Sequence, residues 1–369
     1  NGERRYNRIG PTMIQGCYFM LALAVVLFTA SQYFSPIILR DIIESPQVYD
    51  ATADYLHWRT YGIFFSFLCV MFRAYYVGIT QTKILTINSV VMLLSNVVLN
   101  YCLIFGKGGF PVMGIAGAAI ASSVSEAVSL LFFIIYTGTT ADKRKYGFRR
   151  AFTFRPHLLK GMLSISGWTM VQSFISVSIW FIFFLAIEHL GERPLAVTNI
   201  VRNISALLIM VISAFATTAG ALISNQIGAG EQRYLFRTCG MTLNLTYAIL
   251  VPLLVILCLF PEPVLRVFTD NPSLIAASIN SVYVMSTSTL IMAPAFILFN
   301  AVSGTGNTKA GFIMEMISLT VYTAAVYYIV IRLKPDVALC WFSEHVYGIA
   351  LIALAWWYLK SGKWRGKKV

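Results

Sequence analysis

The chain has 369 residues, of which 58% are hydrophobic and 12% are charged. An average soluble domain is roughly one quarter charged, so this composition excludes an ordinary water-soluble protein. The formal net charge is +13, and the placement of the basic residues decides whether that charge serves a nucleic-acid partner or membrane topology.

Apolar runs long enough to cross a membrane recur along the whole chain. A helix needs about 20 residues to cross roughly 30 Å of hydrocarbon. The sequence therefore predicts an all-α membrane protein with ten visible spans. The spans are expected at 11–34, 58–79, 84–105, 114–137, 162–188, 197–222, 238–260, 275–301, 310–331 and 344–360.

The basic residues lie mainly on one side of the predicted membrane. With the first residues in the cytoplasm, nineteen Lys and Arg fall in cytoplasmic segments and seven on the opposite side, where the loop 35–57 is acidic. This is the positive-inside pattern, so the charge reports orientation and indicates no nucleic-acid partner. The sequence predicts a bacterial-type cytoplasmic (inner) membrane protein with both visible ends in the cytoplasm.

Two charged residues lie in the interiors of the first four spans. Glu126 is the deepest, near the middle of 114–137, and serines surround it at helical spacing. A charge at that depth is costly without a role or a partner. Glu126 is therefore an ion-coupling candidate, with a structural Glu held by hydrogen bonds or an Arg as the equal alternative. Arg73, in 58–79, is the partner to test, although its side chain could instead snorkel to the cytoplasmic surface.

The longest polar stretch, 138–160, predicts a basic cytoplasmic linker between two lobes. Its Lys and Arg residues are interpreted as a solvated topology signal, with binding of anionic lipid headgroups as the alternative. The expected domains are an N-terminal lobe of four spans at 1–137, a C-terminal lobe of six spans at 161–360, and a basic cytoplasmic tail at 361–369.

The sequence repeats itself once. Residues 2–6 (GERRY) return as 230–234 (GEQRY), and 80–83 (TQTK) return as 306–309 (GNTK). Two spans precede the repeated landmark in the second half but not in the first, so the first two of twelve helices are expected to be missing. Duplicated helical bundles are typical of transporters, whose halves move around a site between them.

The span 162–188 carries one polar face. Gln172, Ser173, Ser176 and Trp180 recur at helical spacing along it. These groups predict an adaptable cavity wall for an amphipathic cation, with the Trp180 ring as a cation–π surface. Hydrogen bonding between helices is the alternative.

Two polar residues in later spans complete the candidate substrate cavity. They are Arg202 and Asn300, and Asn300 lies close to the position in the second half that matches Arg73. Arg202 and Glu315 each lie near a span end, where snorkelling to the surface is the competing expectation.

Four glycines punctuate short segments on the cytoplasmic side: Gly228, Gly230, Gly304 and Gly306. Glycine permits turns that other residues resist, so these positions are predicted to be tight turns or hinges. The six cysteines and four histidines show no ligand spacing. Neither a disulfide, a metal site nor a cofactor is predicted.

Three stretches resemble the recurrent motifs of a known family, the multidrug and toxic compound extrusion transporters. They are 96–121 (NVVLNYCLIFGKGGFPVMGIAGAAIA), 224–230 (SNQIGAG) and 303–308 (SGTGNT), in the family's order across nearly the whole chain. The small residues of the first stretch are also what close helix packing in a membrane requires.

The resemblance implies export of organic cations in exchange for H⁺ or Na⁺, by alternating access between two six-helix lobes. It implies coupling acids on the first helix, or on the seventh and tenth. The matching spans 162–188 and 275–301 hold no acid in their interiors, so the coupling ion stays open between H⁺ and Na⁺. The expected partners are small-molecule organic cations and membrane lipids, and the expected state is a monomer.

Two other classes of function were weighed against an exporter. A related flippase for lipid-linked sugar precursors is expected to need a wide basic cavity for a pyrophosphate, and it is the alternative. An intramembrane enzyme is expected to show a His/Asp, Ser/Lys or metal constellation at membrane depth, and the sequence offers none. The sequence therefore predicts a transporter and no enzyme.

Overall fold

The computed structural model describes residues 1–43, 45–148 and 151–365. The regular elements among these residues are all helical, which confirms the predicted all-α membrane fold. The chain forms two compact units, one reaching Met162 and the other beginning at Leu163. The boundary falls inside helix α6 (Pro156–Glu188), so a single helix runs from one unit into the other.

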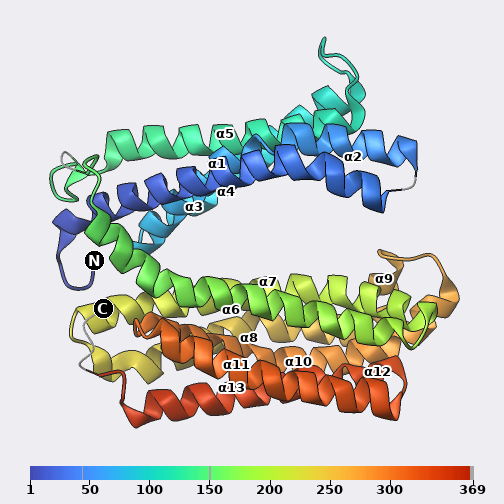
Figure 1. The fold of residues 1–369 in the computed structure, drawn as a ribbon. Helices are drawn as coiled ribbons and strands as arrows, with labels where there is room; N and C mark the ends of the chain where they lie inside the picture. The colour runs from blue at the N-terminus through green and yellow to red at the C-terminus, as the bar shows by residue number, and fades with distance from the viewer. Residues whose placement is uncertain (44, 149–150, 366–369) are drawn as a thin grey trace. The chain divides into compact units, whose positions relative to one another are not determined.

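The first unit consists of long helices that follow a short 3₁₀ turn, η1 (Tyr6–Arg8). The helices are α1 (Ile9–Ile42), α2 (Pro46–Arg59), α3 (Gly62–Gly78), α4 (Lys83–Phe105) and α5 (Gly114–Thr140) (Figure 1). The small residues at the start of α5 pack closely, as predicted. A Cβ at Gly117 would lie 2.7 Å from the carbonyl oxygen of Leu103 in α4, so glycine is what permits the two backbones to approach.

The predicted span 58–79 and the predicted outer loop 35–57 both differ from the structure. Helices α2 and α3 meet at a bend of 46°, and α1 and α2 fill most of the expected loop. At the bend, Thr60 Oγ1 donates to the carbonyl oxygen of Leu56, and such back-bonding by Thr often bends helices. The prediction differs because hydropathy shows only where a helix leaves the hydrocarbon. The helix itself can continue into the polar region, because its backbone hydrogen bonds do not depend on apolar side chains.

The predicted linker 138–160 comprises the end of α5, the segment 141–155 and the start of α6. Asp142 organises the first turn of this segment, because its carboxylate accepts from the backbone N–H groups of Lys145 and Arg144. The hydrogen bond from Lys145 is the largest cause of the lowered pKa of Asp142, and the hydrogen bond from Arg144 lowers that pKa further. The linker residues 149–150 lie outside the described residues.

The second unit contains the rest of α6 and the elements that follow it. These are α7 (Glu192–Gly228), η3 (Gln232–Tyr234), α8 (Leu235–Leu259), α9 (Pro261–Arg266), α10 (Pro272–Gly304), α11 (Thr308–Val326), the π-helical η4 (Tyr327–Leu333), α12 (Val337–Cys340) and α13 (Phe342–Ser361). After α13, the Trp364 indole N–H donates to the carbonyl oxygen of Leu359. Residues 366–369 of the predicted tail 361–369 lie outside the described part.

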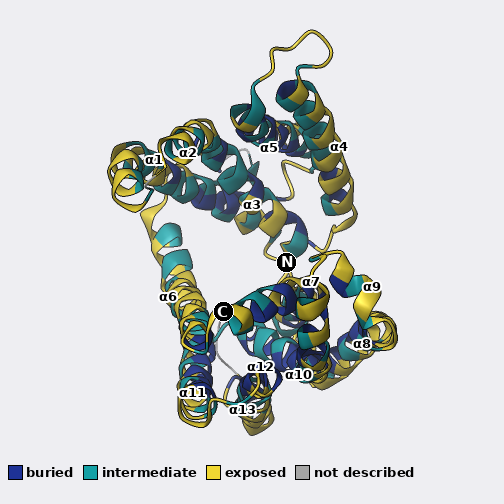
Figure 2. Ribbon diagram, turned by 90° about the vertical axis from the view of Figure 1, so that its right-hand side faces the viewer, coloured by how far each residue is buried: buried dark blue, intermediate teal, exposed yellow. Residues whose placement is uncertain are grey.

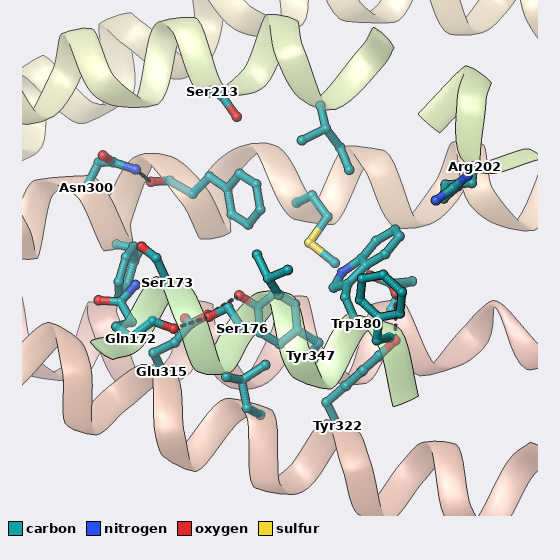
Figure 3. A pocket seen from close by; sticks show the side chains of 18 of the residues that line it. Gln172, Ser173, Ser176, Trp180, Arg202, Ser213, Asn300, Glu315, Tyr322 and Tyr347 are labelled. Atoms are coloured by element: carbon teal, nitrogen blue, oxygen red, sulfur yellow. Dashed lines mark hydrogen bonds between the residues drawn. The ribbon is translucent and has the colours of Figure 1, made fainter. Parts of the chain in front are cut away.

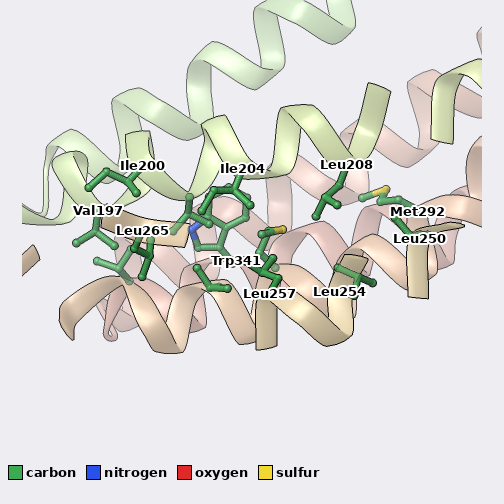
Figure 4. Close-up of a cluster of buried hydrophobic side chains, with 14 of the residues drawn as sticks. Val197, Ile200, Ile204, Leu208, Leu250, Leu254, Leu257, Leu265, Met292 and Trp341 are labelled. Atoms are coloured by element: carbon green, nitrogen blue, oxygen red, sulfur yellow. The ribbon is translucent and has the colours of Figure 1, made fainter. Parts of the chain in front are cut away.

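The main hydrophobic core of the second unit gathers around Trp341, which is 1% exposed. Side chains from α7, α8 and α10 surround it in Figure 4, among them Val197, Ile204 and Leu257. The Phe183 ring of α6 meets the Trp341 ring edge-on at 5.7 Å. This packing attaches α6 to the remainder of the unit. It leaves the polar face of α6 for other contacts.

The chain is an integral membrane protein. Among the described residues, nine helices are long and apolar enough to span a membrane, or ten when the bent pair α2 and α3 counts as one span. Figure 2 shows that α6 is mostly exposed or intermediate, and its exposed residues include Phe174, Ile182 and Leu185. Such an apolar exterior is suited to hydrocarbon and not to water.

Candidate functional site

A cavity of about 900 Å³ lies in the second unit, lined by α6, α7, α10, α11 and α13 (Figure 3). The six residues predicted to form a substrate cavity all line it. They are Gln172, Ser173, Ser176, Trp180, Arg202 and Asn300. Helical spacing on α6 was sufficient to place the first four together, because they share one face. That the cavity takes substrate stays a prediction.

Glu315 forms part of the cavity wall. Its side chain is 4% exposed, and its Oε1 accepts from Ser176 Oγ and from Tyr347 Oη, each at 2.9 Å (Figure 3). The expected snorkelling of Glu315 is therefore wrong. A Glu side chain is short, and the hydroxyl groups on α6 and α13 provide hydrogen bonds that keep it inside.

A second acid, Glu344, also lines the cavity, and the sequence reasoning missed it. It is 6% exposed and accepts a hydrogen bond from Tyr322 Oη at 3.0 Å. Glu344 was read as the first residue of its predicted span, where an acid needs no explanation. The spacing of these residues could have indicated a shared polar site. Glu344 and Tyr347 lie one helical turn apart on their helix, and Glu315 and Tyr322 lie two turns apart on theirs.

Arg202 and Asn300 occupy other parts of the cavity wall. Arg202 is exposed, and its guanidinium lies over the Phe184 ring at 4.8 Å. Its snorkelling stays a prediction. Figure 3 shows Arg202 well apart from Glu315. Asn300 Nδ2 donates to the carbonyl oxygen of Phe296 at 2.9 Å, within its own helix.

The ion-coupling candidates of the first unit, Glu126 and Arg73, are not paired with each other. Glu126 is held by Arg59, whose Nη2 and Nη1 donate to Oε1 at 2.7 Å and Oε2 at 2.9 Å. Arg73 is exposed. The tested pairing with Arg73 is therefore wrong, whereas the alternative of a Glu held by an Arg is confirmed, with Arg59 as that residue. Gly62 makes room for the pair, because a Cβ there would overlap both Arg59 and Glu126.

The four predicted turn or hinge glycines fall into two kinds. Gly230 and Gly306 lie between helices with φ of +80° and +79°, a backbone conformation that favours glycine. Gly228 and Gly304 instead end α7 and α10. A Cβ on Gly304 would lie 2.5 Å from the carbonyl oxygen of Gly220 in α7, so Gly304 serves close helix packing.

A family model described as MatE matches residues 1–102 and 169–329. Among curated proteins, the "Probable multidrug resistance protein NorM" of Thermotoga maritima is 26% identical over 286 residues, which cover 74% of this chain and 59% of that protein. The "Uncharacterized transporter YisQ" of Bacillus subtilis is 25% identical over 268 residues, covering 69% and 56% respectively. The chain thus spans about three fifths of the length of these relatives.

Solved structures share the fold. A MOP superfamily transporter from Pyrococcus furiosus, whose binding pocket is described as having reverse polarity, has a TM-score of 0.89 at 17% identity, covering 99% of this chain and 82% of that one. The eukaryotic MATE transporter AtDTX14 has a TM-score of 0.82 at 17% identity, covering 99% and 81%. Because the family model accounts for more than half of the residues and the fold agrees over nearly all of them, the chain belongs to the MatE family of multidrug and toxic compound extrusion transporters.

Proposed function

We propose that the protein is a secondary active exporter that moves organic cations or drugs out of the cell in exchange for H⁺ or Na⁺, by alternating access between its two lobes. The observation that carries the proposal is the cavity of about 900 Å³ in the second unit, whose wall holds two buried acids. Ligand pockets for drug-sized molecules have volumes of about 300 to 1,000 Å³.

The chemistry of the cavity wall is suited to a cation with apolar substituents. Trp180, Phe181, Phe184 and Phe296 provide aromatic surface, and a cation over such a ring is attracted by its quadrupole. Glu315 adds a carboxyl group, which can offset the charge of a bound cation. Hydroxyl and amide groups on α6 supply hydrogen bonds that can adapt to different ligands.

The same wall argues against the alternative, a flippase for lipid-linked sugar precursors. Arg202 is the single basic residue that lines the cavity in the described part of the chain. Two acids, Glu315 and Glu344, line the same cavity. A pyrophosphate carries several negative charges and would meet two acids and one guanidinium there. Its binding would be opposed by like charge.

The proposal includes the placement of the protein in the cell. The excess of Lys and Arg in alternate loops supports a bacterial-type cytoplasmic membrane with both visible ends in the cytoplasm. Organic cations and membrane lipids are the proposed partners of a monomer.

Efflux of ethidium from proteoliposomes containing the full-length protein tests the proposal, with H⁺ and Na⁺ gradients imposed separately. Efflux driven by one of the two gradients is expected, and that gradient identifies the coupling ion. Absence of efflux under both, with protein shown to be folded by size-exclusion chromatography, would contradict the exporter and favour the flippase.

The aromatic wall gives a residue-level form of this test. Trp180→Ala removes a cation–π surface that contributes about 0.5 to 2 kcal/mol, so the apparent KM for ethidium is expected to rise about 2-fold to 30-fold. Trp357→Ala is the matched control, because Trp357 is 64% exposed on α13 and does not line the cavity. An equal KM for the two variants would remove Trp180 from the substrate site.

A further inference from the structure

Helices α11 and α13 are joined by two reciprocal hydrogen bonds at the cavity wall. Glu315 on α11 accepts from Tyr347 on α13, and Glu344 on α13 accepts from Tyr322 on α11. The two tyrosine rings meet edge-on with centroids 5.9 Å apart. Each acid is therefore held by the tyrosine of the opposite helix, and both acids line the same cavity.

One oxygen of this arrangement has no partner. Glu315 Oε1 accepts two hydrogen bonds, whereas the buried Oε2 accepts none. A buried carboxylate oxygen without a partner costs free energy, because it has lost its water and gained nothing in return. A proton on Oε2 removes the buried negative charge, and a cation in the cavity offsets it. The site is thus built for a positive charge that can be exchanged.

We propose that Glu315 is the proton-carrying residue of this exporter, and that the charge of an organic cation bound in the cavity drives release of the proton from Glu315 Oε2. This inference rests on the proposed function and assigns its coupling ion and its coupling residue. Glu344 is a positioning residue, because it accepts a hydrogen bond from Tyr322 and so ties α13 to the helix that carries Glu315. The helices concerned are α11 and α13, and the resemblance to the family does not imply acids there.

A proton suits this position better than a metal ion. A proton needs a single oxygen, whereas a metal cation has to be surrounded by several oxygen ligands. The hydroxyl groups of Ser176 and Tyr347 both donate to Glu315 Oε1. In the part of the chain that the structure describes, no three His, Cys, Asp or Glu residues gather as metal ligands.

The charged and titratable groups around Glu315 come from several helices. Tyr347 and Glu344 face the cavity from α13, Tyr322 from α11 itself and Arg202 from α7, while Ser176 of α6 does not titrate. Arg202 lies apart from Glu315 (Figure 3). His345 is held by Thr287 on α10 and does not line the cavity.

The exchange step conserves charge. The protonated Glu315 loses its Oε2–H bond, the proton passes to water, and the charge of the resulting carboxylate is offset by the cation bound in the cavity. One positive charge enters as one leaves, so the site never holds an isolated buried carboxylate. Ser176 and Tyr347 can donate to Oε1 throughout, which keeps the side chain in place.

Proton release on binding tests this assignment directly. Tetraphenylphosphonium is added to the purified full-length protein in weakly buffered detergent solution, and a pH dye reports released protons while isothermal calorimetry reports binding. The unaltered protein is expected to release close to one proton per bound cation at a pH where Glu315 is protonated. Glu315→Gln is expected to bind the cation more weakly and to release none.

Two further variants distinguish a role of Glu315 in carrying a proton from a purely structural role, in which its hydrogen bond with Tyr347 would act as a brace between α11 and α13. Tyr347→Phe removes the brace but keeps the carboxyl group, so proton release is expected to persist at lower thermal stability. Glu262→Gln is the matched control, because Glu262 is an exposed acid on α9 outside the cavity, and it is expected to behave like the unaltered protein.

The outcomes distinguish this inference from the proposed function. Undiminished proton release by Glu315→Gln, or loss of release in Tyr347→Phe with cation binding intact, would overturn the role of Glu315 and leave the exporter standing. Absence of cation binding by the folded, unaltered protein would overturn the exporter and this assignment together. In proteoliposomes, Glu315→Gln is expected to retain ethidium counterflow and to lose efflux driven by a proton gradient.

Discussion

At the scale of single residues, Glu126 and Arg59 form a bidentate ion pair between α5 and the end of α2. The Arg59 side chain is 32% exposed and the Glu126 side chain 12%. Bidentate pairs of this kind are geometrically specific, and a charge left alone at that depth is costly. The pair explains why an acid is tolerated in the middle of α5. It also makes Glu126 a weaker coupling candidate than Glu315, because both of its oxygens are occupied.

Removing Arg59 is therefore expected to destabilise the protein. Arg59→Met leaves Glu126 unpaired, at a cost of about 2 kcal/mol, and the melting temperature in detergent is expected to fall by several degrees. Glu126→Gln added to Arg59→Met is expected to restore part of that loss, because it removes the unpaired charge. Arg73→Met, at an exposed position, is expected to change stability by no more than about 0.5 kcal/mol. Equal melting temperatures for Arg59→Met and Arg73→Met would show that the pair contributes nothing.

At the scale of helices, α7 and α10 approach each other through two glycines. A Cβ on Gly220 would lie 2.9 Å from the carbonyl oxygen of Asn300, and one on Gly304 2.5 Å from that of Gly220. The obstructing atoms belong to backbones and cannot rotate away, so a methyl group would push the helices apart. Close backbone contact of this kind provides the packing that holds membrane helices together.

Gly304→Ala is expected to cost about 1 to 3 kcal/mol through overpacking. Gly240 of α8 is the matched control, because a Cβ there would meet nothing within 4 Å. Gly240→Ala is expected to be neutral or to stabilise the helix by about 0.5 to 1 kcal/mol. Thermal melting of both variants, followed by fluorescence-detected size-exclusion chromatography, makes the comparison. If Gly304→Ala melts no earlier than Gly240→Ala, the close contact is not needed.

At the scale of the whole molecule, topology follows from charge. The basic residues Lys143, Arg144 and Lys145 lie after α5, whereas the loop between α4 and α5 has Lys107 alone. The positive-inside rule predicts that the first group lies in the cytoplasm. Lys143 and Lys107 are both exposed, so a label could reach either residue from its own side of the membrane.

Cysteine labelling in intact cells tests this orientation. Lys107→Cys and Lys143→Cys are made separately in a chain whose six cysteines are replaced by serine. A membrane-impermeant maleimide is expected to label position 107 in intact cells and position 143 only after the cells are opened. Labelling of position 143 in intact cells would reverse the proposed orientation.

The amino-acid sequence by itself determined the membrane class, the number of apolar runs and the polar face of α6. These follow from local rules: hydrocarbon thickness sets span length, and helical geometry places Gln172, Ser176 and Trp180 on one side. The resemblance identified the family from motifs that are contiguous in the chain. The bend between α2 and α3 could not be predicted, because the sequence around it has the pattern of an acidic loop followed by one apolar run.

Only the tertiary structure decided which residues the buried acids meet. Arg59 and Glu126 are 67 positions apart, and Ser176 and Glu315 are 139 apart. Periodicity shows that a residue lies on a polar face, but it does not show which helix packs against that face. In a membrane the choice of neighbour depends on close packing and polar contacts, because lipid is as apolar as the side chains it touches.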